Sequence, residues 1–170
     1  MSGIPRFPVY VFDLDGTLMD SAADICGAIQ QVLSGTPQRP QVNEEFLRRY
    51  IGLHLIDLFQ DLGFCAEQID PMIVEYRRLY PARGHTSTRV YPGVLEALAA
   101  LPGKKSTATT KGTPSTRAVL EQFGLLPFFD HIQGTDGFPA KPEPDVIFAA
   151  LKGLGAEPSE CLFVGIRRRI

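Results

Sequence analysis

The feature that most constrains the fold is a short apolar run that ends at a pair of acids. Residues 8–12 read Pro-Val-Tyr-Val-Phe, and Asp13 and Asp15 follow at once. A short apolar run rich in β-branched and aromatic residues is typical of a strand buried on both faces, as in a parallel sheet. Parallel strands need long crossover connections, so helices should follow. The sequence therefore predicts an α/β fold whose first strand ends at residue 12.

The rest of the chain changes its pattern near residue 88. Helical spacing dominates before that point, over 22–33, 44–50, 55–62 and 66–80, with Asp20-Ser21 and Asn43 as candidate N-caps. Beyond it, candidate strands at 105–109, 131–133 and 161–164 alternate with candidate helices at 94–101, 113–123 and 144–154. Such alternation predicts βαβ units and a Rossmann-like parallel sheet. We expect a core of residues 1–19 and 88–170, interrupted by a helical cap at 20–87, with the strand at 161–164 beside the first.

Composition excludes several classes of function. The 17 Lys and Arg residues against 19 Asp and Glu residues give a net charge of −2, which argues against a broad nucleic-acid surface. No apolar stretch approaches the ~20 residues that span a bilayer, and the first residues do not resemble a signal peptide. We therefore expect a cytoplasmic protein without a membrane partner; the oligomeric state is not indicated. Cys26, Cys65 and Cys161 lack the spacing of disulfide frameworks or zinc sites, so we expect reduced thiols in the core.

Candidate functional residues follow the predicted strands, because ligands of open α/β sheets bind beyond the carboxyl ends of the strands. Asp13, Thr109 and Lys141 stand at or near such positions. Asp13 and Asp15 place two carboxylates on one tight turn, where they can act as nucleophile and acid/base and can hold a hard cation. The alternative is a solvated turn or helix cap, which is common for a lone Asp-Gly pair but needs no buried strand before it.

The segment Val11–Leu18, with Asp20-Ser21, resembles motif one of the haloacid-dehalogenase-like hydrolase superfamily. It is most similar to phosphoglycolate-phosphatase-like members with a helical cap, and the resemblance continues through residues 91–94 and 141–145. It implies that Asp13 attacks phosphorus, that Asp15 protonates the leaving alcohol, and that both bind Mg²⁺. Members that cleave carbon–halogen bonds lack the second acid. Asp15 therefore favours a phosphatase, although a phosphomutase shares every one of these motifs. The overall resemblance implies a small phosphorylated metabolite, such as phosphoglycolate, as the substrate.

Two further motifs fit the same resemblance. Thr109 and Thr110 resemble motif two, in which a hydroxyl and a backbone N–H hold a phosphoryl oxygen, although Thr110 stands where relatives often carry Asn. Lys141 opens a Lys-Pro-Glu-Pro loop whose prolines restrict the backbone, and the resemblance implies that it bridges nucleophile and phosphoryl group.

Arg48 and Arg49 in the predicted cap could reach an anionic group of the substrate, with Arg49 as the candidate binding residue. An exposed arginine pair on a helix is the alternative that we favour. The three histidines, His54, His85 and His131, have no catalytic neighbours in the sequence, so we expect surface or packing roles.

The last five residues depart from the resemblance. The fourth motif should bring a magnesium-binding Asp directly after Gly165, but residues 166–170 read Ile-Arg-Arg-Arg-Ile. Deleting one base from a possible coding sequence for Gly-Asp-Thr-Pro-Pro-Asp yields Gly-Ile-Arg-Arg-Arg-Ile. We therefore expect a reading-frame slip, and the rival is a genuine short protein with a basic tail. A truncated core would be almost inactive and prone to aggregate, which leaves a non-enzymatic remnant that binds an anion weakly as an alternative.

Overall fold

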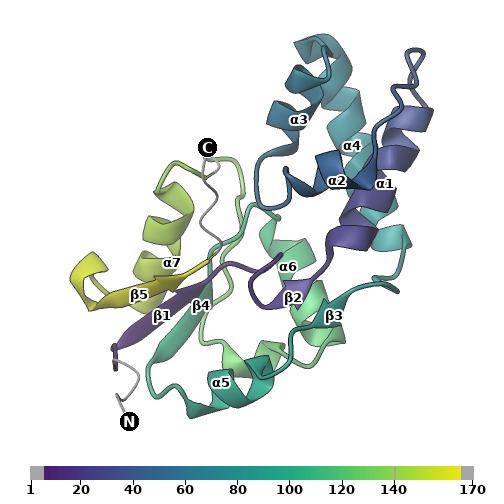
Figure 1. The fold of residues 1–170 in the computed structure, drawn as a ribbon. Coiled ribbons are helices and arrows are strands. Elements are labelled where there is room, and N and C mark those ends of the chain that lie inside the picture. Colours follow the sequence, from purple (N-terminus) through teal and green to yellow (C-terminus); the bar gives the residue numbers. More distant parts are fainter. Residues whose placement is uncertain (1–5, 140, 166–170) are drawn as a thin grey trace. The chain divides into compact units, whose positions relative to one another are not determined.

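The computed structural model describes residues 6–139 and 141–165, and these form two compact units (Figure 1). One unit combines the described residues up to Met19 with those from Val90 onward, and the other is Asp20–Arg89. Helices in the described part of the chain are all too short or too polar to cross a membrane.

The first unit is built on a parallel sheet of three strands in the order β4-β1-β5 (Figure 1). These strands are β1 (Val9–Phe12), β4 (Lys104–Thr107) and β5 (Cys161–Val164). In the register, Phe12 lies opposite Thr107 on one side and Val164 on the other. All four residues of β1 are buried, as expected for a central strand. The predicted α/β fold and the predicted pairing of 161–164 with the first strand are both confirmed.

Helices supply apolar side chains to both faces of this sheet. They are α5 (Val94–Ala100), α6 (Thr113–Gln122) and α7 (Asp145–Leu154), and short 3-10 turns form at Leu126–Phe128 and Pro158–Glu160. Because side chains alternate along a strand, Tyr10 and Phe12 join one buried cluster while Val9 and Val11 join another. The first cluster includes Leu98, Val119 and Leu120 from α5 and α6; the second includes Val146, Ala150 and Leu151 from α7.

The strand expected at 131–133 does not form, and that prediction is wrong. Only isolated bridges join Ser106 to His131 and Thr109 to Gly134. The hydroxyl of Thr107 explains why, since it donates to the carbonyl of Gln133 and accepts from the N–H of Gln133, both at 2.9 Å. The Thr107 side chain therefore takes up the backbone N–H and carbonyl of Gln133, which a regular strand at 131–133 would pair with the backbone of β4.

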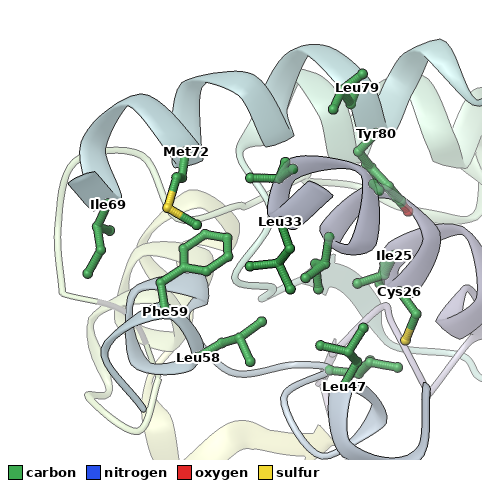
Figure 2. Close-up of a cluster of buried hydrophobic side chains, with 14 of the residues drawn as sticks. Ile25, Cys26, Leu33, Leu47, Leu58, Phe59, Ile69, Met72, Leu79 and Tyr80 are labelled. Carbon is green, nitrogen blue, oxygen red and sulfur yellow. The ribbon is translucent and has the colours of Figure 1, made fainter. Parts of the chain in front are cut away.

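The second unit contains four helices close to the predicted ranges, α1 (Ala22–Ser34), α2 (Glu44–Arg48), α3 (Leu55–Asp61) and α4 (Ala66–Ala82). The Asn43 side chain caps α2 by accepting from the N–H of Phe46 at 2.8 Å. His54 caps α3, its Nδ1 accepting from the N–H of Ile56 at 3.3 Å. Figure 2 shows the core of this unit, where Leu33, Leu58 and Phe59 point toward one another between helices.

A two-stranded sheet forms where the chain passes from one unit to the other. It pairs β2 (Met19–Asp20) with β3 (Arg89–Val90), and the N–H of Tyr91 donates to the carbonyl of Leu18 at 3.1 Å. Neither strand was expected, because two residues are too few to show a periodic pattern.

The three cysteines are free thiols in different environments. Cys26 is buried, Cys161 is partly buried and Cys65 is exposed at the N-cap of α4. The prediction of a core position is therefore wrong for Cys65, since capping a helix end places a residue at the surface rather than on the helix's apolar face.

Candidate active site

Asp13 stands directly after β1, where the strand's hydrogen bonding continues for one more residue. Its N–H donates to the carbonyl of Val164 at 2.9 Å, so the backbone is held by β5. Its Oδ1 accepts from the N–H of Leu14 at 2.8 Å, and its Oδ2 lies 2.8 Å from the Nζ of Lys141. The Asp13 residue is only 4% exposed. The predicted nucleophile and the predicted lysine are therefore brought into direct contact.

Burial and Lys141 act on the Asp13 carboxyl in opposite directions. Burial has the larger effect and raises the pKa of Asp13 above its ordinary value, while the Lys141 ammonium and the Leu14 N–H lower it. Lys141 is also fixed from two other sides, by a hydrogen bond to the carbonyl of Ala108 at 3.4 Å and by the Phe163 ring, whose centroid is 5.9 Å from Nζ. The arrangement holds a carboxylate and an ammonium together in a largely dry place.

Asp15 lies on the tight turn that follows Asp13. Gly16 adopts a φ of 79°, which glycine tolerates without strain, and its N–H donates to the carbonyl of Met19 at 2.8 Å. The Oδ2 of Asp15 lies 3.3 Å from the Nζ of Lys111, with the two side chains 7% and 9% exposed. Lys111 was not among the predicted site residues. Its position directly after Thr109-Thr110 was the available signal, but nothing in the sequence linked it to Asp15.

Thr109 follows β4 at the same edge of the sheet as Asp13 follows β1, because Phe12 pairs with Thr107. Thr109 is buried; its Oγ1 accepts from the N–H of Lys111 at 3.3 Å, and its carbonyl accepts from the Thr135 hydroxyl at 2.9 Å. Thr110, the next residue, is partly exposed. The loop therefore presents a threonine hydroxyl and backbone groups, the donors that suit a phosphoryl oxygen.

Gly134 lets a second segment pack tightly under this loop. A Cβ at position 134 would lie 2.3 Å from the carbonyl oxygen of Lys111 and 2.5 Å from the N of Thr113, so no larger residue fits. The Oδ1 of Asp136 accepts from the N–H of Thr113 at 2.9 Å and holds the start of α6. Residues 109–113 are thus positioned by packing rather than left as a free loop.

Arg48 and Arg49 belong to the helical unit. Arg48 pairs with Glu44 at 2.7 Å, and Arg49 lies 3.9 Å from Glu45 with its side chain 67% exposed. This matches the favoured alternative of an exposed arginine pair along a helix, and a role for Arg49 in substrate binding stays a prediction.

The donor set of Asp13 and Asp15 fits a hard divalent cation in its chemistry, since Mg²⁺ prefers carboxylate oxygen. Each carboxylate uses one oxygen for a lysine. Within residues 6–139 and 141–165, no group of three or more acidic, His or Cys side chains is gathered as a metal site. Within the described residues, further oxygen ligands are available from backbone carbonyls. The acid expected in the fourth motif falls on 166–170, which lie outside the described residues.

Comparison with known proteins gives concordant matches. A sequence profile described as "Haloacid dehalogenase-like hydrolase" matches residues 10–166. Phosphoglycolate phosphatase 1 of Pseudomonas aeruginosa is 31% identical over 97% of this chain and 64% of its own length, so the chain spans less than two thirds of that relative. A phosphoglycolate phosphatase of Caulobacter vibrioides is 32% identical over 91% of this chain and 69% of its own length. A predicted phosphatase from Clostridium acetobutylicum superimposes with a TM-score of 0.84 at 29% identity, over 94% of this chain and 76% of that one.

Proposed function

Because the chain belongs to the haloacid dehalogenase-like hydrolase family, we propose that it hydrolyses a small phosphate monoester, with Asp13 as the nucleophile. One observation carries the proposal: the buried Asp13 carboxylate lies 2.8 Å from the Lys141 ammonium at the carboxyl end of β1. Named relatives that are phosphatases support the reaction class. A buried carboxylate kept beside a cation is what a nucleophile for a phosphoryl group requires.

The first step transfers the phosphoryl group to Asp13. A carboxylate oxygen of Asp13 forms a bond to phosphorus as the bond from phosphorus to the ester oxygen breaks. Asp15, two residues on, donates a proton to the leaving oxygen, and the products are an alcohol and an aspartyl phosphate. Lys141 offsets the negative charge of the three phosphoryl oxygens, and the Thr109 hydroxyl with neighbouring backbone N–H groups holds one of them.

The second step returns the chain to its starting state. Water attacks phosphorus, Asp15 accepts a proton from this water, and the bond from phosphorus to the Asp13 oxygen breaks to release inorganic phosphate. The Nζ of Lys111 lies 3.3 Å from the Oδ2 of Asp15 and restricts the position of this side chain. Mg²⁺, held by oxygens of Asp13 and Asp15, would supply further charge neutralisation on the phosphoryl group.

For the substrate we propose a compact phosphorylated metabolite, with phosphoglycolate as the first to be tested. The support is the similarity to proteins named phosphoglycolate phosphatase in Pseudomonas aeruginosa, Caulobacter vibrioides and Vibrio vulnificus. In this proposal Arg49 binds a second anionic group of the substrate, since a guanidinium suits a carboxylate.

The test is release of inorganic phosphate from phosphoglycolate and from a panel of small phosphate esters, with Mg²⁺ present. We expect Asp13→Asn and Asp15→Asn each to lower turnover by about 10³ or more, because they remove the nucleophile and the acid/base. Asp70→Asn changes an exposed acid of the helical unit and serves as the matched control.

Each other outcome has a definite meaning. An isomeric phosphate ester in place of free phosphate would identify a phosphomutase. Undiminished turnover in Asp13→Asn would contradict the assignment of the nucleophile. A folded wild-type chain that releases no phosphate from any ester would favour the non-enzymatic alternative.

A further inference from the structure

Asp24 is a fully buried carboxylate that the proposed reaction does not use. It lies in the first turn of α1 and is 0% exposed. An acid at this position of a helix commonly turns back to the N-cap residue in a capping box, but Ser21, the N-cap, makes no side-chain capping hydrogen bond. The contacts of Asp24 run instead to a segment about sixty residues further along the chain.

Three groups of the segment 83–88 converge on this carboxylate. The Oδ2 of Asp24 accepts from the N–H of Ser87 at 3.0 Å and from the hydroxyl of Thr88 at 2.8 Å. Its Oδ1 lies 3.6 Å from the Nε of Arg83. Thr88 is 0% exposed, so its hydrogen bond to Asp24 is shielded from water. A charge buried this completely stabilises a fold only when its partners are held in place, which makes the network sensitive to the loss of any one of them.

Gly27 allows Arg83 to reach this position. A Cβ at residue 27 would lie 2.5 Å from an Nη atom of Arg83, so the guanidinium rests against the backbone of α1. Glycine inside a helix is unfavourable compared with alanine, and this close approach is a physical reason for having it here. Arg89, which directly follows the segment 83–88, also contacts its backbone. Its Nη1 donates to the carbonyls of Thr86 and Thr88 at 2.7 and 2.6 Å.

These contacts tie together the two ends of the helical unit. Asp24 comes four residues after the last residue of β2, and Thr88 comes directly before β3. The β2–β3 pair itself has only two residues in each strand, too few to hold two chain segments together by backbone hydrogen bonding alone.

We propose that Asp24 is an anchor that fastens the returning segment 83–88 to the first turn of α1, and so keeps both ends of the helical unit together. The anchor is a conformational device built into the fold. Its removal frees the returning segment locally, while the helices that form the apolar core of the unit stay folded.

Limited proteolysis of the full chain tests the anchor, because trypsin cleaves only backbone that opens locally. The bonds after Arg83 and Arg89 lie within or at the end of the returning segment, and those after Arg48, Arg49, Arg77 and Arg78 serve as internal references. We expect Asp24→Asn to speed cleavage after Arg83 and Arg89 about tenfold or more, since a hydrogen-bonded charge is lost. Cleavage at the reference bonds should change by less than about twofold. Asp70→Asn is the matched control for the loss of an acid.

A second pair of variants, each of which removes only one hydroxyl group, tests the proposal if Asp24→Asn does not fold. Thr88→Val removes one hydroxyl that donates to Asp24, whereas Thr86→Val makes the same change at an exposed position of the same segment. Faster cleavage after Arg83 and Arg89 in Thr88→Val but not in Thr86→Val supports the anchor. Equal acceleration at every arginine, or no acceleration, overturns it. Proteolysis needs no turnover, so the outcome is independent of the proposed phosphatase activity.

Discussion

Two opposing influences act on the pKa of the Asp13 carboxyl, burial and the ammonium of Lys141. Burial raises its pKa, and the Lys141 ammonium at 2.8 Å is the largest influence in the other direction. A nucleophilic carboxylate must be ionised to attack phosphorus. The lysine therefore has two roles in the proposed reaction, since it favours the charged form of Asp13 before attack and offsets phosphoryl charge during it.

Replacing this lysine should separate activity from folding. In Lys141→Met the pKa of Asp13 rises further, and we expect kcat to fall by about 10² to 10³, the range found when one preorganised charge-stabilising donor is removed. Phosphate release measured across pH should also show the acid limb of the rate profile moving to higher pH. Lys152→Met, at an exposed position of α7, is the control. A variant with wild-type turnover would show that Lys141 has only a structural role.

Cys26 and Cys65 show how position sets the behaviour of the same side chain. Burial raises the pKa of the Cys26 thiol to about 11, with the charge of Glu44 adding to the effect, while Cys65 is exposed. The thiolate is the reactive form, so iodoacetamide at pH 8 should label Cys65 at least about tenfold faster than Cys26. Peptide mass mapping of the folded chain measures both rates. Equal labelling would mean that the core around Cys26 opens readily.

The same thiol predicts a loss of stability at alkaline pH. An unfolded cysteine ionises near its ordinary pKa of 9.0, whereas burial in the folded chain raises the pKa of Cys26 to about 11. Between these values the folded state binds more protons than the unfolded state, so this contribution is intact below about pH 9 and is lost as pH rises toward 11. Urea unfolding from pH 8 to 11 should show a shallower decline for Cys26→Ala than for wild type, while Cys65→Ala should follow the wild type.

At the scale of elements, the Thr107 hydroxyl binds the backbone of the segment in which a further strand was expected. It makes two 2.9 Å hydrogen bonds to the backbone of Gln133 and is itself fully buried. We expect Thr107→Val to lower the free energy of unfolding by about 1–3 kcal/mol, because a backbone donor and acceptor lose their partner. Thr107→Ser keeps the hydroxyl and should recover most of this loss in a denaturant titration. If the serine variant is as unstable as the valine variant, packing of the threonine methyl is the larger contribution.

The helices and the strands of the three-stranded sheet could be predicted because their signals are local. The apolar run of β1 and the capping side chain of Asn43 each fix a boundary within a few residues. The strand expected at 131–133 does not form, because the Thr107 hydroxyl rather than a neighbouring strand binds the backbone of Gln133. The pattern of apolar residues in the sequence gives no information about such a side-chain hydrogen bond. Sequence reasoning selected Asp13, Asp15, Thr109 and Lys141 as candidate site residues, but it missed the pairing of Lys111 with Asp15, which depends on how two distant turns meet.

At the scale of the whole molecule, each compact unit has apolar packing of its own. The buried cluster of the helical unit draws its residues from Asp20–Arg89, as Figure 2 shows for Leu58, Phe59 and Met72. The two clusters on either side of the sheet draw theirs from the other unit, with Leu120 and Leu151 as fully or nearly fully buried members. Each unit is therefore stabilised by its own apolar core. Parts of a protein that are stabilised separately can unfold independently.

Reciprocal core variants should show this independence. Phe59→Ala creates a cavity in the helical unit at a cost of about 3–5 kcal/mol, and Leu120→Ala creates one beside the sheet at about 2–5 kcal/mol. Amide hydrogen exchange in native buffer should lose protection in α1 and α4 for Phe59→Ala, with β1 and β4 unchanged, and the reverse for Leu120→Ala. Both side chains are 0% exposed, so the two substitutions are matched in burial. If either variant lowers protection equally in both units, the two units unfold together in one cooperative transition. A cavity in one core would then lower the free energy of unfolding that protects both units by the same amount.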